Sequence, residues 1–300
     1  MPYADNDGVS LYYEVTDPVE DGDPSDDTAD VSDADASGAE TVALVEGLGY
    51  GRWMWRWQRD GLAGGQGSPS GATRSHDDEG YRVVVWDNRG TGDSDAPEGP
   101  YTIAEMASDL EAVLDAVGAE RAHVVGASMG GMIAQQYALD YDRAESLGLL
   151  CTGPGGDDAV PTPEETRARM FDAPEGADER EAVRYKMKPA MTDEFWDANQ
   201  DLVEEIVDWR LAGDASDAAR DAQAAAVAGF DASDRLGEID VPALVAHGTD
   251  DRVLPVGNAD LLYEGLPNAQ LAVFEGGSHL FFIERADVVN DRLAEFLAHV

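Results

Sequence analysis

Short apolar runs alternate with amphipathic stretches over most of this chain, and the spacing of the apolar positions predicts the elements. Alternating apolar and polar side chains at residues 9–15 are typical of an edge strand, whereas unbroken apolar runs are typical of strands buried on both faces. Thr102 and Glu105 form a capping box, which predicts the start of a helix. The alternation predicts the α/β class, with a mostly parallel and doubly wound sheet. The other elements expected here are strands at 41–45, 81–86 and 122–125 and helices at 102–117 and 129–141.

The middle of the chain breaks this alternation. From residue 152 to residue 229 the sequence carries helical patterns with no strand between them, one of which spans 192–210. Two earlier stretches, an acidic one at 16–40 and one rich in Gly and Ser at 63–80, lack a core-forming pattern and are expected to be loops. The predicted organisation is an α/β core made of 1–151 and 233–300, with a helical insertion at 152–232.

The candidate chemistry begins at Gly126-Ala127-Ser128-Met129-Gly130, where a predicted strand meets a predicted helix. A strand, a sharp turn with serine at its apex and a helix form a nucleophile elbow. The apical residue takes a strained backbone conformation, and the residues two positions to either side must lack a side chain to fit the turn. The motif occurs once in the sequence, and it makes Ser128 the candidate nucleophile.

A serine nucleophile needs a base and an acid, which follow it in this class of fold in the order Ser, Asp or Glu, His. Of the five histidines, His247 and His279 follow Ser128 and stand clear of the terminus. His247 precedes any plausible acid, so we expect a structural role for it. His279 lies in a Gly-rich loop ahead of the last helical pattern and is the candidate base.

The acid is expected after the preceding strand, because functional groups gather at the carboxyl ends of the strands in α/β sheets. Asp250 and Asp251 both lie in that loop. We choose Asp251 and keep Asp250 as the alternative. The carboxylate would hold the imidazole of His279 in one tautomer and stabilise its protonated form.

The oxyanion hole of such a site requires two backbone N–H donors. The amide of Met129 lies at the start of the predicted helix, where the helix dipole also favours negative charge. The second donor is expected in the Gly-rich stretch after the strand at 41–45, where Leu48 is the candidate.

With these residues in place, the chain resembles the α/β-hydrolases and, within them, the 3-oxoadipate enol-lactonase-like esterases and lactonases. The resemblance implies the α/β-hydrolase fold, and it implies that the helical insertion is a cap over the active site. The family's site residues fall on Ser128 (nucleophile), Asp251 (acid), His279 (base), and Leu48 and Met129 (oxyanion donors). The segments that carry the resemblance are VEGLGYGRWMWRW (45–57), VWDNRGTGDSD (85–95), HVVGASMGGMIAQQ (123–136), DRLGEIDVPALVAHGTDDRVLP (234–255) and FEGGSHLFFIE (274–284).

One departure from the family concerns the oxyanion loop. Many relatives have His-Gly where this chain has Glu46-Gly47, and a carboxylate beside an oxyanion would oppose the charge that the site should stabilise. We expect Glu46 to point away from the site or to pair with Arg52 or Arg89. The turn at 87–90 is interpreted as a support for this loop, with substrate binding by Arg89 as the alternative.

Apolar side chains in the predicted cap and after the oxyanion loop are candidates for a substrate pocket. Helix packing is the plainer alternative for each of them. The substrate-binding residues that we select are Trp53, Trp55 and Trp196. The other candidates are Met54 and Trp57 after the oxyanion loop, and Met170, Phe171, Tyr185, Met187, Met191, Phe195 and Trp209 in the cap.

These features predict a serine hydrolase that cleaves an ester or a lactone through an acyl-enzyme, with a small acyl compound as substrate and with no cofactor or metal. One alternative is other chemistry on the same fold, such as acyl transfer, cofactor-free haloperoxidase-like activity or hydrolysis of a carbon–carbon bond. Another is a ligand receptor without activity. A dehalogenase is disfavoured because it would need aspartate in place of Ser128.

Composition limits the class of protein further. No charged and apolar leader stands at the amino terminus and no apolar run is long enough to span a bilayer, so we expect a cytoplasmic enzyme. The single cysteine, Cys151, excludes an internal disulfide and is expected to pack in the core.

The net charge of −42 is extreme, since 62 Asp and Glu side chains oppose 20 Lys and Arg side chains. Such a surface would repel nucleic acid and anionic membranes alike. Salt screens the repulsion among the carboxylates, so the charge predicts a halophilic host. A calcium-binding loop at 33–44 is the alternative, but Leu44 stands where an EF-hand requires glutamate.

We therefore predict that the protein needs salt to remain folded. The repulsion should weaken as the Debye length falls from about 10 Å at 0.1 M salt to about 3 Å at 1 M, so the melting temperature should rise steeply with KCl. Thermal unfolding in roughly 0.1 M and 2 M KCl measures the effect, and chloride is preferred because sulfate also strengthens apolar burial. A midpoint that is unchanged or lower at the higher concentration would contradict the prediction.

Overall fold

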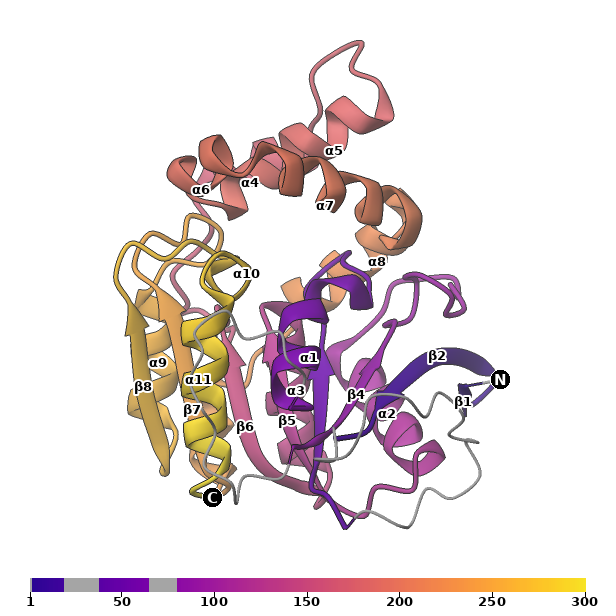
Figure 1. Ribbon diagram of the computed structural model, residues 1–300, viewed down its shortest axis with the longest axis vertical. Helices are drawn as coiled ribbons and strands as arrows, with labels where there is room; N and C mark the ends of the chain where they lie inside the picture. The colour runs from indigo at the N-terminus through magenta and orange to yellow at the C-terminus, as the bar shows by residue number, and fades with distance from the viewer. Residues whose placement is uncertain (1, 19–37, 65–79) are drawn as a thin grey trace.

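The computed structural model describes residues 2–18, 38–64 and 80–300 (Figure 1). Most of the acidic stretch at 16–40 and of the Gly- and Ser-rich stretch at 63–80 lies outside these residues. Figure 1 shows a twisted sheet with helices on both faces and a further group of helices beyond one end of the strands.

The sheet has eight strands in the order β1-β2-β4-β3-β5-β6-β7-β8. The strands from β4 to β8 in this order run parallel, whereas β2 pairs antiparallel with both β1 and β4. The strand expected at the edge is β2, and that prediction is wrong because the short β1 covers its outer side. The strands are β1 (Tyr3–Asn6), β2 (Val9–Thr16), β3 (Thr41–Val45), β4 (Arg82–Trp86), β5 (Ala122–Ala127), β6 (Ala144–Leu150), β7 (Ala243–Gly248) and β8 (Ala269–Phe274).

Helices cover both faces of the sheet because successive side chains of a strand point to opposite faces. In β3, Val42 and Leu44 face one apolar core, and Ala43 and Val45 face the other. The first core is closed by α1 (Arg56–Leu62) and α11 (Ala286–Leu297), and the second by α2 (Ile103–Ala116), α3 (Met129–Asp140) and α9 (Gly257–Gly265). The capping box predicted at Thr102 is present at the start of α2.

The segment between β6 and β7 is helical, as the sequence pattern predicted. Figure 1 shows α4 to α7 as a layer beyond the edge of the sheet where the parallel strands end, and α8 leads back to the core. The single helix expected at 192–210 is instead two helices, with the break at Asn199. The side-chain amide of Asn199 donates to the carbonyl of Phe195 at 2.9 Å. The helices of this layer are α4 (Glu164–Phe171), α5 (Glu179–Met187), α6 (Asp193–Ala198), α7 (Gln200–Gly213) and α8 (Asp217–Ala228).

Four short helices complete the described part of the chain, and two of them follow loops at the carboxyl ends of strands. The helix α10 (Phe281–Glu284) directly follows the loop after β8. The 3-10 helix η1 (Arg52–Trp55) follows the loop after β3. The remaining 3-10 helices are η2 (Lys188–Ala190) and η3 (Ser233–Glu238).

The junction of β5 and α3 is so tightly packed that two of its residues have no room for a side chain. A Cβ added at Gly126 would lie 2.1 Å from the carbonyl oxygen of Gly130, and one added at Gly130 would lie 2.1 Å from the carbonyl oxygen of Val45. Both distances are far inside van der Waals contact. The two glycines of the sequence motif are therefore required so that the first turn of α3 can lie against β3.

Candidate active site

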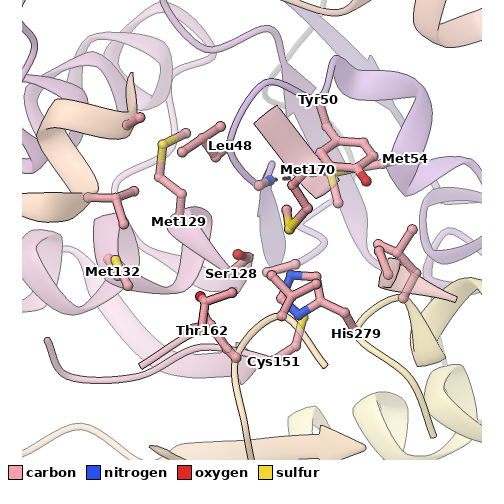
Figure 2. A pocket seen from close by; sticks show the side chains of 18 of the residues that line it. Leu48, Tyr50, Met54, Ser128, Met129, Met132, Cys151, Thr162, Met170 and His279 are labelled. Atoms are coloured by element: carbon pink, nitrogen blue, oxygen red, sulfur yellow. Dashed lines mark hydrogen bonds between the residues drawn. The ribbon is translucent and has the colours of Figure 1, made fainter. Parts of the chain in front are cut away.

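Ser128 occupies the sharp turn between β5 and α3. Its backbone has φ 56° and ψ −119°, a conformation that residues with a side chain rarely adopt and that costs on the order of 1–3 kcal/mol. Hydrogen bonds fix this turn on β6: the amide of Ser128 donates to the carbonyl of Leu150 at 2.9 Å, and its carbonyl accepts from the hydroxyl of Thr152 at 2.7 Å. With the backbone held in this way, Ser128 lines a cavity at the edge of the sheet (Figure 2).

His279 lines the same cavity, and one of its ring nitrogens is held by Asp251. The distance from Nδ1 of His279 to Oδ2 of Asp251 is 2.7 Å. An ionised carboxylate accepts hydrogen bonds and does not donate them, so Nδ1 carries the proton and Nε2 is the basic nitrogen of the ring. The arrangement therefore gives the cavity one serine hydroxyl and one imidazole with a free basic nitrogen.

Asp251 is buried, but both of its oxygens have partners. Oδ1 accepts from the amides of Val253 and Leu254 at 2.8 and 2.9 Å, and Oδ2 lies 2.7 Å from His279 and 3.2 Å from Nε2 of His247. Burial by itself would raise the pKa of Asp251. The charge of His279 and the hydrogen bonds from both imidazoles outweigh burial and lower this pKa to about 2, so the carboxylate is ionised at neutral pH.

The structure separates the two candidate acids. Asp250 is exposed, and its carboxylate accepts from the hydroxyl of Thr249 at 3.2 Å. Asp251, in contrast, turns inward to His279. His247 supports the same loop, since its Nε2 also lies 2.7 Å from the carbonyl oxygen of Leu254.

The two candidate oxyanion donors also line the cavity. Met129 is the first residue of α3, where an amide has no acceptor within the helix. The amide of Leu48 makes no hydrogen bond to any other residue that the structure describes. The loop that carries Leu48 is anchored to α8, because the amide of Gly49 donates to Oε1 of Gln223 at 2.7 Å. Both amides are thus available to a ligand oxygen in the cavity.

The cavity lies between the sheet edge and the helical layer, and it has a volume of about 200 Å³. Three of the side chains expected in a pocket line it, Met54 of η1 and Met170 and Phe171 of α4. Sequence reasoning missed several other wall residues. Met132 could have been found, because it lies one helical turn after Met129, whereas the small residues of α8 give no signal. The missed residues are Tyr50, Met132, Thr162, Arg167, Ala190, Ala224, Val227, Ala228, Val253, Leu254, Leu280 and Phe282.

The three tryptophans selected as substrate-binding residues do not line this cavity. Trp55 is fully buried and packs against α10. The indole N–H of Trp53 donates to Asp214 at 2.9 Å, which points the ring to the connection between α7 and α8. Trp196 packs within the helical layer, with the guanidinium of Arg184 5.0 Å from its ring. The positions of all three are explained by packing between elements.

Glu46 is completely buried, and neither of its carboxyl oxygens has a partner among the described residues. The expected pairing is wrong: Arg52 binds three other carboxylates, and Arg89 makes two hydrogen bonds to Asp109 at 2.6 and 2.7 Å. Glu46 does not line the cavity either, which agrees with a side chain that points away from it. Burial, and then the charge of Asp87, raise the pKa of Glu46 well above its ordinary value.

The turn at 87–90 supports the oxyanion loop. The carboxylate of Asp87 accepts from the amides of Arg52 and Asp93, both at 3.0 Å. The side-chain amide of Asn88 donates to the carbonyl of Glu46 at 3.3 Å. Because the guanidinium of Arg89 faces α2 and does not line the cavity, the structural interpretation of this turn fits its contacts.

Cys151 follows β6, is fully buried and is one of the residues that line the cavity (Figure 2). Burial, and then the charge of Asp251, raise the pKa of this thiol well above its ordinary value, so the thiol stays protonated and unreactive.

Among the described residues, one group of three possible metal ligands occurs, and it lies at the opposite end of the strands.

Comparison with known proteins places the chain in a family. A family model described as the alpha/beta hydrolase fold matches residues 60–286. The chain belongs to the α/β-hydrolases. It is 31% identical to a protein of Azorhizobium caulinodans named "Putative carbamate hydrolase RutD", over 100% of this chain and 99% of the relative. It is 34% identical to the 2-hydroxy-6-oxononadienedioate/2-hydroxy-6-oxononatrienedioate hydrolase of Paraburkholderia phymatum, over 87% of this chain and 88% of the relative.

Solved structures agree with this assignment. The enol-lactonase from Burkholderia xenovorans LB400 superimposes with a TM-score of 0.76 and 26% identity, over 99% of this α/β-hydrolase and 100% of the lactonase. The predicted α/β-hydrolase fold is therefore confirmed, and the family is one of hydrolases. The names of the relatives refer to a carbamate, an oxo-dioate and an enol-lactone, so membership of the family does not decide which bond is cleaved.

No helix in the described part of this α/β-hydrolase is long and apolar enough to cross a membrane.

The environment of Glu46 predicts a pH-dependent effect on stability. Because its pKa is raised in the folded state, its contribution to stability is complete below the pKa of the unfolded chain, near 4.5, and declines as pH rises toward the folded pKa. Glu46→Gln keeps the shape of the side chain and removes the ionisation. The variant should therefore unfold at a higher urea concentration than the parent at pH 8, and this advantage should shrink as pH falls toward 5.

A matched control is Glu264→Gln, which removes one charge from an exposed position. It should show no comparable dependence on pH. Since Glu46 does not line the cavity, turnover by Glu46→Gln should stay within a few fold of the parent. A variant that is less stable at pH 8, or one that loses about a hundredfold in turnover, would contradict this account of Glu46.

Proposed function

We propose that this α/β-hydrolase is a serine hydrolase that cleaves a carboxylic ester or a lactone through an acyl-enzyme. One observation carries the proposal: a strained serine and a histidine held by a buried carboxylate line the same cavity. The structural similarity to an enol-lactonase supports a lactone or ester as the substrate.

In the proposed acylation step, Nε2 of His279 accepts the hydroxyl proton of Ser128 while Oγ attacks the acyl carbon. The negative oxygen that forms accepts hydrogen bonds from the amides of Leu48 and Met129. The ionised carboxylate of Asp251 stabilises the imidazolium and keeps Nδ1 protonated. The proton on Nε2 then passes to the alkoxide oxygen, which leaves as an alcohol or, from a lactone, stays attached to the acyl group.

Deacylation uses the same groups in reverse. His279 removes a proton from water, the hydroxide attacks the acyl carbon, and the proton returns to Oγ of Ser128 as the acid is released. Cys151 takes no part, because its thiol is buried and protonated.

The cavity suggests a compact and apolar acyl group. Its volume of about 200 Å³ lies below the range of roughly 300–1,000 Å³ that is common for ligand sites. Most of its wall is apolar, with Met54 and Leu280 from the core facing Met170 and Phe171 from α4. Substrates with a long acyl chain should therefore react more slowly than short ones.

A second candidate function is cleavage of a carbamate or of a carbon–carbon bond beside a carbonyl group. The end-to-end similarity to a relative named for carbamate hydrolysis favours the first of these, and the 34% identity to an oxo-dioate hydrolase favours the second. Both reactions would use the same groups around Ser128. A substrate panel of acyl esters, lactones, enol-lactones, carbamates and oxo-dienoates, assayed in high KCl with product analysis, separates the candidates.

We predict that Ser128→Ala and His279→Ala each lower kcat on the best substrate of the panel by roughly 10⁴-fold or more, and that the double variant is little worse than either one. Asp251→Asn should lower kcat by roughly 10³- to 10⁴-fold, because the wrong tautomer of His279 is then favoured. The matched control is Asp250→Asn, which changes an exposed side chain and should stay within a few fold of the parent.

Steady-state kinetics on variants with parental circular dichroism and melting temperature measures these effects. Substantial hydrolysis by Ser128→Ala would rule out the acyl-enzyme. If Asp250→Asn were crippled and Asp251→Asn were not, the proposed acid would be wrong. If the esters and lactones were inert and a carbamate or oxo-dienoate were cleaved, the second candidate would replace the first.

A further inference from the structure

Three side chains that can bind a metal meet at the end of the sheet opposite to the active site. Glu40 directly precedes β3, His123 is the second residue of β5, and Glu145 is the second residue of β6. The strands β3, β5 and β6 are neighbours in the sheet. One ligand atom of each residue lies within 4.8 Å of those of the other two. At ~3.3 Å per residue, His123 lies about 16 Å from Ser128 along β5, so the two sites are separate.

An irregularity in the sheet brings these side chains together. The pairing of β5 with β6 changes register between Ala122, which faces Ala144, and His123, which faces Ser146. Glu145 is therefore an extra residue in β6 with no partner across the ladder. Such a bulge redirects a side chain that would otherwise point to the opposite face. Here it allows Glu145 to approach His123.

The imidazole of His123 is almost fully buried, with a side-chain exposure of 1%, and its Nε2 has no hydrogen-bond partner among the described residues. Nδ1 lies 2.8 Å from the hydroxyl of Ser146, which fixes the ring. Nε2 lies 3.6 Å from Oε2 of Glu40 and 3.9 Å from Oε2 of Glu145, too far for a hydrogen bond. A buried nitrogen thus faces two carboxylates across a gap that a positive ion would fill.

The distances from Nε2 of His123 to the two carboxylates are close to those in a zinc site. Zinc binds imidazole nitrogen and carboxylate oxygen at roughly 2.0–2.2 Å in a tetrahedron, which separates neighbouring ligand atoms by about 3.3–3.5 Å. The distances of 3.6 and 3.9 Å need to contract by only a few tenths of an ångström. The orientation of the ring by Ser146 is the kind of support that metal-bound histidines have.

We propose that Glu40, His123 and Glu145 bind a divalent metal ion such as Zn²⁺, with water as the fourth ligand. The imidazole ligand favours such an ion over Mg²⁺ or Ca²⁺, which prefer sites made of oxygen atoms. Glu40 is 56% exposed and gives the ion a path from solvent. Arg121 binds the other oxygen of Glu145, at 2.6 Å, and leaves Oε2 free. The ion would fasten three adjacent strands together at the end remote from Ser128.

The test is titration of the full-length, chelator-treated protein with Zn²⁺ in competition with a chromophoric chelator, in high KCl. The parent should bind one equivalent tightly, and its melting temperature should rise with Zn²⁺. Glu40→Gln should weaken this binding at least tenfold, and His123→Gln should abolish it. The matched control is Glu120→Gln, which removes an exposed carboxylate from the loop before β5 and should bind Zn²⁺ as the parent does.

Two results would overturn the proposal. Absence of saturable binding at one equivalent would mean that the three side chains do not form a metal site. Equal binding by the parent, Glu40→Gln and His123→Gln would mean that Zn²⁺ binds the acidic surface at large. Glu40 is mostly exposed, so Glu40→Gln keeps the test decisive even if His123→Gln does not fold. An excess of Ca²⁺ or Mg²⁺ that displaces the Zn²⁺ would contradict the choice of metal.

Discussion

The close contact between the first turn of α3 and the sheet is the constraint on which the candidate active site depends. It leaves space for hydrogen alone at Gly126 and Gly130, and it holds Ser128 at a positive φ. The strain is local, and the buried strands on either side of β5 offset it. The same turn ends β5 at the cavity and begins a helix there. The hydroxyl of Ser128 and the amide of Met129 therefore reach one space from one short segment of backbone.

Two buried carboxyl groups near this turn show how partners decide charge. Burial alone would raise the pKa of Asp251, but the charge of His279 and the hydrogen bonds from His247 and His279 lower it to about 2. Glu46 has no such partner, so burial, and then the charge of Asp87, raise its pKa. The first group supplies a fixed negative charge behind His279. The second lies two residues before Leu48, and its raised pKa disfavours a negative charge beside the two candidate oxyanion donors.

The parts of this structure that the sequence predicts are those with a local cause. The mostly parallel sheet, the elbow at Ser128 and the helical insertion follow from periodicity and from one motif. Asp250 and Asp251 have the same local signal, and only the folded loop shows which of them meets His279. Trp53 and Trp55 do not line the cavity, and a packed aromatic ring looks the same in a sequence whether it touches a ligand or another helix. The cluster around His123 depends on a shift in strand register, which no local pattern reveals.

The central claim is that Ser128 is the nucleophile of this α/β-hydrolase. A serine-directed phosphonate probe, followed by peptide mass spectrometry, tests it most directly. The account predicts one modified residue, Ser128, with loss of activity in proportion to labelling and with protection by a slow substrate. Labelling of another residue, or full activity in protein that is completely modified at Ser128, would contradict the account.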